Sequence, residues 1–294
     1  MNAAADLFDV LVSLVKPGSV LLLSGAGIST ESGIPDYRGP TGRRRASDPI
    51  QYREFVSSAA ARRRYWARSA VGWPHVRRAE PNAGHRAVAE LERAGLLSGV
   101  ITQNVDGLHQ AAGSRTVVEL HGTLYRVVCL GCGALSDRDT LQQTMLLDNP
   151  DWNVEAARIT PDGDAVLPQP LVDSFRPPRC ERCGGALKPQ VVLFGENVPC
   201  EVVQRAWDLL ERSRTVLVVG SSLSVYSGYR FADRAAREGK PVALLNQGYT
   251  RADRLAALKI EAPIGRTLAR LVDRLSDCCR DGIRFADRRG SQVQ

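Results

Sequence analysis

The sequence predicts an α/β protein with a doubly wound parallel sheet and one smaller inserted module. Short apolar runs rich in β-branched residues recur along the chain, and amphipathic stretches separate them. Strands of a parallel sheet are covered by helices on both faces, so they are typically apolar throughout. The segment 125–188 interrupts this alternation with several prolines and two pairs of cysteines, which indicates a module inserted between two strands of the main sheet.

Six apolar runs are the expected strands, at 20–24, 100–102, 117–120, 191–194, 215–220 and 242–246. The amphipathic stretches 84–93, 202–212 and 229–238 are the expected helices between them. We therefore expect a Rossmann-like domain made of residues 1–124 and 189–286, with 40–80 as a helical part of the smaller lobe. Residues 125–188 are the inserted module, and 287–294 are expected to form a polar tail.

Composition and charge fit an ordinary globular protein. Of the 294 residues, 44% are hydrophobic, and no apolar run approaches the roughly 20 residues that span a bilayer. The acidic first segment matches neither a secretory signal nor a transit peptide, so we expect a cytoplasmic protein without a membrane partner. Arginine clusters at 43–45, 62–64 and 77–78 add to a net charge of +7. Such clusters can bind nucleic acid, but no nucleic-acid module accompanies them, and a solvated surface is the simpler interpretation.

Four of the seven cysteines form two C-x-x-C pairs, Cys129 with Cys132 and Cys180 with Cys183. Four sulfurs close a tetrahedral shell around Zn²⁺, so the predicted metal is structural rather than catalytic. A disulfide framework is not expected in a cytosolic chain of this size. Two incidental pairs stay open as an alternative, because the gap between them is longer than in simple zinc ribbons. The remaining cysteines are expected to be ordinary thiols: Cys200, Cys278 and Cys279.

The first expected strand leads into a glycine-rich turn, Ser24-Gly-Ala-Gly-Ile-Ser-Thr. Glycines at such a position let the backbone approach a pyrophosphate, and a helix N-terminus behind them supplies amides and a positive dipole end. The dinucleotide fingerprint of dehydrogenases needs a third glycine, and Thr30 occupies that position. Taken alone, the segment predicts either a phosphate-binding turn or a tight turn without a ligand.

The turn runs directly into Ser32-Gly-Ile-Pro-Asp-Tyr-Arg-Gly39, and together the two segments resemble the sirtuin signature G-A-G-[IV]-S…S-G-I-P-D-[FY]-R. Further blocks similar to this family follow in its order: Thr102-Gln-Asn-Val-Asp-Gly-Leu-His109, Glu119-Leu-His-Gly122, Gly220-Ser-Ser-Leu-Ser-Val225 and Leu245-Asn-Gln-Gly248. The resemblance covers roughly residues 20–248. Four other segments look most like the class II branch: Tyr65-Trp-Ala-Arg, Gly72-Trp-Pro, Pro161-Asp-Gly-Asp and Val225-Tyr-Ser-Gly-Tyr-Arg.

The resemblance implies an NAD-dependent protein-lysine deacylase, a transferase that moves the acyl group of a modified lysine to ADP-ribose and releases nicotinamide. It implies His121 as the base that activates a ribose hydroxyl, with Asn104 and Asp106 beside it. An imidazole suits this role, since its unperturbed pKa of about 6.5 leaves it largely neutral at pH 7. His109 is expected to be structural, and the other two histidines match no motif.

The residues that the resemblance implies for NAD binding lie in the glycine turn and at the ends of expected strands, where open α/β sheets bind ligands. They are Gly25, Ala26, Gly27, Ser29, Asp36, Tyr37, Arg38, Gln103, Asn104, Asp106, Gly220, Ser221, Ser222, Asn246, Gln247, Gly248 and Ile264. Ile264 stands where class II relatives often have cysteine, and backbone contact is expected there. The two cysteine pairs fall in the family's zinc position, which implies one structural zinc.

The protein substrate is implied to bind as an added strand along Val192, Phe194, Gly195 and Glu196 on one side and Ser224 and Val225 on the other. Tyr65 and Arg68 resemble a pair by which another sirtuin branch recognises acidic acyl chains such as succinyl. We hypothesise a preference for carboxylated or bulky acyl groups. The alternative is that Arg68 pairs with an internal acid and Tyr65 packs.

Other activities are kept as alternatives. Transfer of ADP-ribose to protein would use the same NAD pocket. A dehydrogenase is disfavoured by the incomplete glycine fingerprint. A zinc-bearing protein that senses NAD or binds nucleic acid is suggested only by the metal site and the charge.

Overall fold

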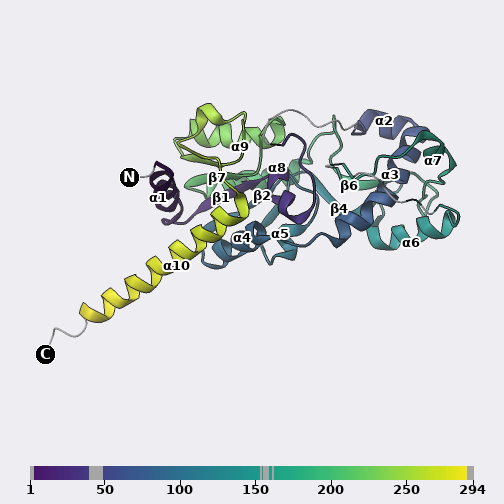
Figure 1. Ribbon diagram of the computed structural model, residues 1–294. Helices are drawn as coiled ribbons and strands as arrows, with labels where there is room; N and C mark the ends of the chain where they lie inside the picture. The colour runs from purple at the N-terminus through teal and green to yellow at the C-terminus, as the bar shows by residue number, and fades with distance from the viewer. Residues whose placement is uncertain (1–2, 40–48, 153, 155–158, 161, 290–294) are drawn as a thin grey trace.

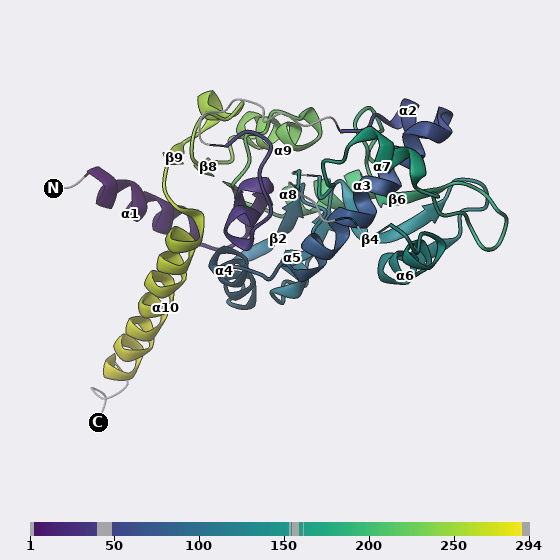
Figure 2. The same ribbon diagram turned by 45° about the vertical axis from the view of Figure 1, so that its right-hand side comes forward.

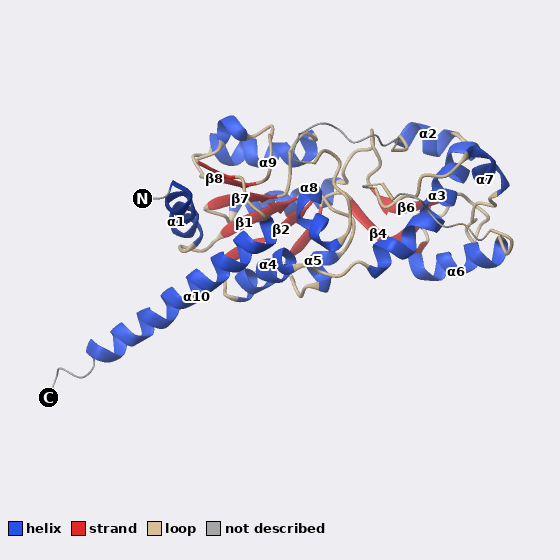
Figure 3. Ribbon diagram, viewed as in Figure 1, coloured by secondary structure: helices blue, strands red, loops and turns tan. Residues whose placement is uncertain are grey.

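The computed structural model describes residues 3–39, 49–152, 154, 159–160 and 162–289, which form a large lobe and a small lobe (Figure 1). Helices alternate with strands in the large lobe, whereas the small lobe carries its own short sheet with helices around it (Figure 3). This arrangement confirms the expected α/β fold with a smaller inserted module. Of the expected polar tail, residues 290–294 lie outside the described residues, and 287–289 continue the last helix.

Within the described residues, six parallel strands form the central sheet of the large lobe, in the order β3-β2-β1-β7-β8-β9. They are β1 (Val20–Ser24), β2 (Leu97–Thr102), β3 (Val117–Glu119), β7 (Thr215–Val219), β8 (Val242–Leu245) and β9 (Leu258–Ile260). The first five coincide with expected strands, and β9 is an additional edge strand. The strand order reverses between β1 and β7, and doubly wound sheets bind their ligands at such a switch point.

The remaining expected strand, 191–194, was wrongly assigned to the main sheet. Val191 ends β6 (Leu187–Val191), which pairs antiparallel with β4 (Gly122–Cys129) in the small lobe. Beyond it, Phe194 forms a single bridge with Gln51. The segment after β6 lies outside both sheets: it lines the cavity between the lobes, and its Leu193 packs in the small-lobe core.

Helices cover both faces of the large sheet, which explains why its strands are apolar throughout. One face packs on α1 (Ala3–Val15), α4 (Ala83–Arg93) and α10 (Ile264–Arg289), and the other on α8 (Cys200–Glu211) and α9 (Tyr226–Arg237). In β1, Leu22 belongs to the first of these cores, whereas Leu21 and Leu23 belong to the second. The far end of α10 extends away from the body of the lobe (Figure 2).

The small lobe is built on an antiparallel sheet of β5 (Leu135–Asp137), β4 and β6 in that order. The helices around it are α2 (Tyr52–Ser57), α3 (Ala59–Arg78), α6 (Arg138–Asp148) and α7 (Gln169–Ser174). Of the segment 40–80 that was expected to be helical, 40–48 lies outside the described residues, and α2 and α3 occupy most of the rest. The sheet extends slightly beyond 125–188 at both ends.

A buried cation ties two helices of the small lobe together. The Arg138 guanidinium, at the start of α6, lies 5.6 and 5.0 Å from the ring centroids of Trp66 and Trp73 on α3. It also donates to the backbone oxygen of Ser69 at 3.2 Å. Burial lowers the pKa of Arg138 to about 10, so the group stays charged at neutral pH and holds α6 against α3.

Short elements complete the described chain: η1 (Ala26–Ser32), α5 (Leu108–Ala111) and η2 (Asp253–Leu255). Among the described residues, no helix combines the length and the apolar character that a membrane crossing would require.

Candidate active site

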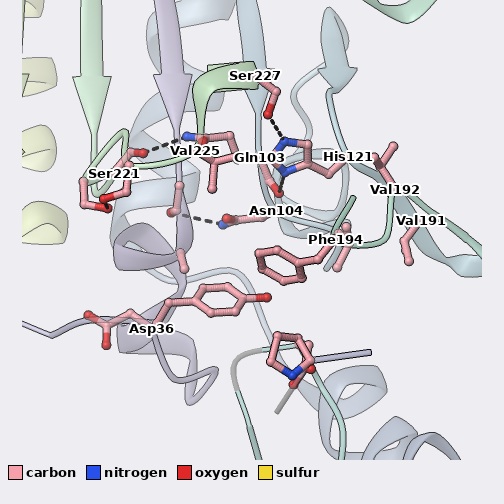
Figure 4. A pocket seen from close by; sticks show the side chains of 18 of the residues that line it. Asp36, Gln103, Asn104, His121, Val191, Val192, Phe194, Ser221, Val225 and Ser227 are labelled. Carbon is pink, nitrogen blue, oxygen red and sulfur yellow. Dashed lines mark hydrogen bonds between the residues drawn. The ribbon is translucent and has the colours of Figure 1, made fainter. Parts of the chain in front are cut away.

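A cavity of about 990 Å³ lies between the lobes, at the carboxyl ends of the central strands. Its large-lobe wall comes from the segments that follow β1, β2, β7 and β8. Its small-lobe wall comes mainly from the segment after β6. Figure 4 shows the part of this cavity in which polar side chains from several of these segments point toward one another.

His121 lies in the turn between β3 and β4 and lines this cavity (Figure 4). Its Nδ1 is 3.0 Å from the backbone oxygen of Gln103, which can only accept a hydrogen bond, so Nδ1 carries the proton of the neutral ring. Nε2 then holds the lone pair, and it lies 2.8 Å from the hydroxyl of Ser227. Burial lowers the pKa of His121, the Gln103 oxygen raises it, and the charge of Arg230 lowers it further. The ring is therefore neutral at pH 7 and can accept a proton at Nε2.

Asn104 and Asp106 are held by the glycine turn. The Asn104 side-chain amide donates to the backbone oxygen of Gly25 at 3.2 Å and to the Ser29 hydroxyl at 3.0 Å. Ser29 donates in turn to an Asp106 carboxylate oxygen at 2.7 Å, and the other carboxylate oxygen accepts from the backbone N–H of Leu108 at 3.0 Å. Burial raises the pKa of Asp106, whereas these hydrogen bonds lower it. The network fixes both side chains at the floor of the cavity.

The glycines of the turn allow two strand-end loops to touch at the switch point. A Cβ atom on Gly27 would lie 2.8 Å from the Cα atom of Gly220, and one on Gly25 would lie 2.7 Å from the Cβ atom of Ser221. The Gly27 N–H donates to the Gly220 oxygen at 2.8 Å. Contact between the loops after β1 and β7 is thus sufficient to require glycine here.

Most residues predicted for the site line this one cavity. They are Gly25, Ala26, Ser29, Asp36, Tyr37, Arg38, Tyr65, Gln103, Asn104, Asp106, His121, Val192, Phe194, Gly195, Glu196, Gly220, Ser221, Ser222, Ser224, Val225, Asn246 and Gln247. Of the residues predicted for NAD and substrate, all of which the structure describes, Gly27, Arg68, Gly248 and Ile264 do not line it. Ile264 is buried in the large-lobe core, and Gly248 accepts a hydrogen bond from Asn246 through its backbone oxygen.

Two exposed segments form opposite sides of the cavity mouth. Phe194 is 38% exposed on the small-lobe side, and Val225 is 43% exposed at the start of α9. The Phe194 ring meets the Tyr37 ring edge to face at 6.4 Å between centroids. Within this segment, the Glu196 carboxylate accepts from the Leu193 N–H and pairs with Lys188, each at 2.9 Å. The segment after β6 is thus anchored to the small lobe where it lines the cavity.

Tyr65 and Arg68 differ in their surroundings. Tyr65 lines the cavity, but its ring packs against Phe55 and Trp66 at 5.5 and 5.1 Å between centroids. Arg68 is buried, donates through Nε to the backbone oxygen of Ala165 at 3.0 Å, and lies 4.0 Å from the Asp164 carboxylate. Burial, and next the Asp164 charge, raise the pKa of Tyr65. These contacts match the alternative in which Arg68 pairs with an internal acid.

The four cysteines of the C-x-x-C pairs meet in the small lobe, and their sulfurs all lie within 4.8 Å of one another. Cys129 and Cys183 are 3.5 Å apart at Sγ, and Cys132 and Cys180 are 3.7 Å apart. Both distances far exceed the roughly 2.05 Å of a disulfide bond. They approach the roughly 3.8 Å edge of a tetrahedron of sulfurs around Zn²⁺ at about 2.3 Å. The predicted four-cysteine cluster is confirmed, and it fits one structural zinc.

Sequence reasoning missed several residues on α8 and α9 that line the cavity, among them Cys200, Trp207, Ser227 and Arg230. The Arg230 guanidinium lies 5.7 Å from the Trp207 ring centroid and donates through Nε to the Ser227 backbone oxygen at 3.1 Å. Ser227 and Arg230 are three residues apart, so helical periodicity places both on one face of α9. That spacing, inside a block already similar to a family motif, was the available signal.

Two further histidines lie buried beneath the glycine turn and should make the protein acid-sensitive. Burial lowers the pKa of His85 to about 3 and that of His109 to about 4. In the unfolded chain each titrates near its ordinary pKa of about 6.5, so the unfolded state binds more protons below that pH. Stability conferred by the neutral rings is therefore complete above pH 6.5 and is lost as the pH falls toward 4.

We expect the free energy of unfolding to drop by a few kcal/mol between pH 7 and pH 4.5. Asp106 opposes this trend, because burial raises its pKa and protonation relieves that cost. Urea unfolding monitored at several pH values measures the slope. A stability that is flat from pH 7 to 4.5 would contradict the prediction.

Comparison with known proteins places this geometry in a family. A family model described as Sir2 family matches residues 25–227. NAD-dependent protein deacetylase 1 of Streptomyces coelicolor is 54% identical over 282 residues, which cover 96% of this chain and 92% of that protein. NAD-dependent protein deacetylase 1 of Mycobacterium avium is 48% identical over 271 residues, which cover 90% of this chain and 95% of that protein.

Solved structures agree with these relatives. A structure described as "Sir2-p53 peptide-NAD+" superimposes with a TM-score of 0.71 at 28% identity, covering 91% of this chain and 98% of that one. Another, described as "Structural Basis for the Mechanism and Regulation of Sir2 Enzymes", has a TM-score of 0.73 at 32% identity, covering 93% of this chain and 99% of that one. The resemblance noted in the sequence is confirmed, and the chain belongs to the Sir2 family, the sirtuins.

Proposed function

We propose that this protein is an NAD-dependent protein deacetylase that transfers an acyl group from a substrate lysine to ADP-ribose and releases nicotinamide. The observation that carries the proposal is the orientation of His121. The Gln103 oxygen holds the proton on Nδ1, and Nε2 presents its lone pair in a cavity lined by the glycine turn and the two exposed segments at its mouth. The names of the most similar relatives support the same activity.

The residues present fit NAD. The cavity lies at the upper end of the roughly 300–1,000 Å³ range of ligand sites, which suits a dinucleotide together with an acyl-lysine chain. The side chains of Gln103, Asn104 and Asn246 offer amide donors and acceptors for the carboxamide and ribose hydroxyls, and Ser221 and Ser222 add hydroxyls after β7. When bound, NAD would supply the ADP-ribose that accepts the acyl group.

His121 acts on a hydroxyl proton in this proposal. The proton passes to Nε2, while Nδ1–H remains on the Gln103 oxygen and stabilises the imidazolium that forms. Asn104 and Asp106 are fixed to the glycine turn through Ser29, so they orient groups beside the base without moving. A positioned base of this kind supplies about 10²–10⁴-fold of rate.

The substrate peptide is proposed to lie across the mouth of the cavity, between the segments of Phe194 and Val225. Both side chains are exposed, and Glu196 anchors the first segment through Lys188. An added strand binds through its backbone and reads sequence weakly. Figure 4 shows Phe194 and Val225 on different sides of the space in front of His121.

For the acyl group, we propose a preference for uncharged chains, with Arg68 as a structural residue. Arg68 does not line the cavity and is engaged by Asp164 and the Ala165 oxygen. The cavity wall near Tyr65 instead includes Asp162 and Asp164. A carboxylated chain would lose solvation beside these two acidic residues, and the Arg68 guanidinium is already engaged.

The test uses purified protein, NAD and peptides that carry acetyl, propionyl, succinyl or glutaryl lysine, with nicotinamide release and peptide mass as readouts. We expect NAD-dependent deacetylation, with acetyl and propionyl peptides processed faster than the carboxylated ones. Arg68→Ala should lower thermal stability without changing that order. Succinyl activity that exceeds acetyl activity and disappears in Arg68→Ala would overturn the proposed acyl preference. A mass gain of ADP-ribose on protein would favour the transferase alternative instead.

A further inference from the structure

Ser227 makes a contact that the proposed chemistry does not by itself require. It is the second residue of α9, and its hydroxyl lies 2.8 Å from Nε2 of His121 (Figure 4). Because Nδ1 of the neutral ring carries the proton, Nε2 can only accept, so the Ser227 hydroxyl donates. Nε2, the atom that must take a proton in the proposed reaction, thus already accepts a hydrogen bond from Ser227.

The position of Ser227 is fixed by the same residue that holds the other side of the ring. A Cβ atom on Gly228 would lie 2.4 Å from Oε1 of Gln103, so the first turn of α9 packs directly against that side chain. Gln103 is held in turn by the Ser221 hydroxyl, to which it donates at 2.7 Å. Arg230 donates to the Ser227 backbone oxygen at 3.1 Å from the next turn. Both nitrogens of the His121 ring therefore contact groups that Gln103 holds in place: its own backbone oxygen at Nδ1 and the Ser227 hydroxyl at Nε2.

We propose that Ser227 is a positioning residue for the base, which holds Nε2 toward the cavity and stabilises the proton once it has been transferred. The inference rests on the proposed role of His121. A serine hydroxyl both donates and accepts. It donates to Nε2 of the neutral ring, and it rotates its O–H away when the substrate hydroxyl takes its place on the Nε2 lone pair. After the substrate proton has passed to Nε2, the serine oxygen accepts from the new Nε2–H. No covalent bond to Ser227 forms or breaks.

The two hydrogen bonds differ in strength. The bond from imidazolium to the serine oxygen is charge-assisted and roughly twice as strong as the neutral one. Ser227 consequently favours the protonated ring, which makes His121 a better base. Removing the hydroxyl should therefore lower the pKa of His121 by about half to one unit.

Other charged groups lie on the elements packed around the His121 ring. On α9, Arg230 lowers the pKa of His121. After β2, Asp106 is bound to Ser29 and to the Leu108 N–H. After β6, Glu196 is paired with Lys188. At the end of β3, burial raises the pKa of Glu119, and the nearby Arg126 charge lowers it.

Ser227→Ala, Ser227→Thr and a matched control test the proposal. The control is Ser24→Ala, since the Ser24 hydroxyl lies 2.8 Å from Nε2 of His109, the same distance as in the Ser227 pair. NMR titration of the His121 ring, assigned by comparison with His121→Gln, gives its pKa without any need for activity. We expect a lowered pKa in Ser227→Ala, a normal one in Ser227→Thr and no change at His121 in Ser24→Ala.

Turnover of an acetyl peptide at saturating NAD is the second readout. We expect Ser227→Ala to lose about 10-fold in kcat with little change in KM, and Ser227→Thr to recover most of it. An unchanged or raised pKa of His121 in folded Ser227→Ala overturns the inference, as does a loss of kcat that threonine does not restore. Absence of deacetylation by the wild-type protein, with the expected pKa shift still present, would instead reject the proposed function.

Discussion

Replacing His121 by alanine should lower NAD-dependent deacetylation by about 10²–10⁴-fold while the protein stays folded and still binds NAD. The loss follows because no other described side chain offers a lone pair at the position of Nε2, where the proton must go. The substitution leaves no buried charge without a partner, because the ring is neutral. Its hydrogen-bond partners, the Gln103 oxygen and the Ser227 hydroxyl, lie at the cavity wall. Stability should therefore change little.

The measurement compares initial rates of nicotinamide release and peptide deacetylation, with NAD binding followed by calorimetry. His75→Ala is the matched control, because that ring lies outside the cavity lining and forms a hydrogen bond with the Gly33 oxygen. It should retain the wild-type rate. A His121→Ala protein that is folded, binds NAD and deacetylates within a few-fold of wild type would reject His121 as the base.

The dependence of wild-type activity on pH should also report whether His121 is the general base. A general base works in its deprotonated form, and burial lowers the pKa of His121 below its ordinary value. The acid limb of the activity profile should therefore be centred below pH 6.5, the ordinary pKa of histidine. An acid limb centred above pH 7 would contradict a lowered pKa for this group.

Loss of the zinc cluster should unfold the small lobe and abolish activity, although the cluster is not part of the cavity. The sulfurs gather at the end of β4, and the buried Cys129 and Cys180 are part of the small-lobe core. The free energy of metal binding at such a site contributes directly to folding, by on the order of 10 kcal/mol in small zinc domains. β4 runs from Gly122 to Cys129, so the strand that ends at the metal begins next to His121.

Cys132→Ser tests this expectation, because Cys132 is exposed and its substitution leaves no hole in the core. We expect loss of stoichiometric zinc, a lower melting temperature and loss of near-ultraviolet circular dichroism from the small-lobe tryptophans. Cys200→Ser is the control, since that exposed thiol lies outside the cluster and its loss should leave the zinc content unchanged. A Cys132→Ser protein with full metal content, or a metal-free protein with unchanged stability, would contradict the structural role.

Local patterns predicted the parts of the fold that depend on local properties. The strands of the large sheet were predicted because burial on both faces requires apolar residues at successive positions, as in β1 and β7. Each C-x-x-C pair was recognised from its own spacing, whereas the joining of the two pairs at one metal was implied by the resemblance to the family. β9, with only three residues and a partly exposed edge, has too weak a pattern to be recognised.

Contacts between distant segments could not be read in the same way. The Arg68 side chain pairs with Asp164, and nothing in the periodicity of either segment indicates that the two meet. The need for glycine at Gly27 comes from Gly220, a neighbour only in the folded state. Ser227 lies against His121 because α9 packs against Gln103, and this contact likewise exists only in the tertiary structure.

The pairing of β1 with β7 has a consequence for synthesis of the chain. These two strands lie side by side along their whole length at the centre of the sheet, yet the entire small lobe lies between them in sequence. Until Thr215–Val219 has left the ribosome, one edge of the apolar strand β1 has no partner. Unpaired apolar edges are templates for aggregation, and long-range parallel pairing folds slowly. A chaperone that shields β1 during elongation should therefore raise the soluble yield of this protein.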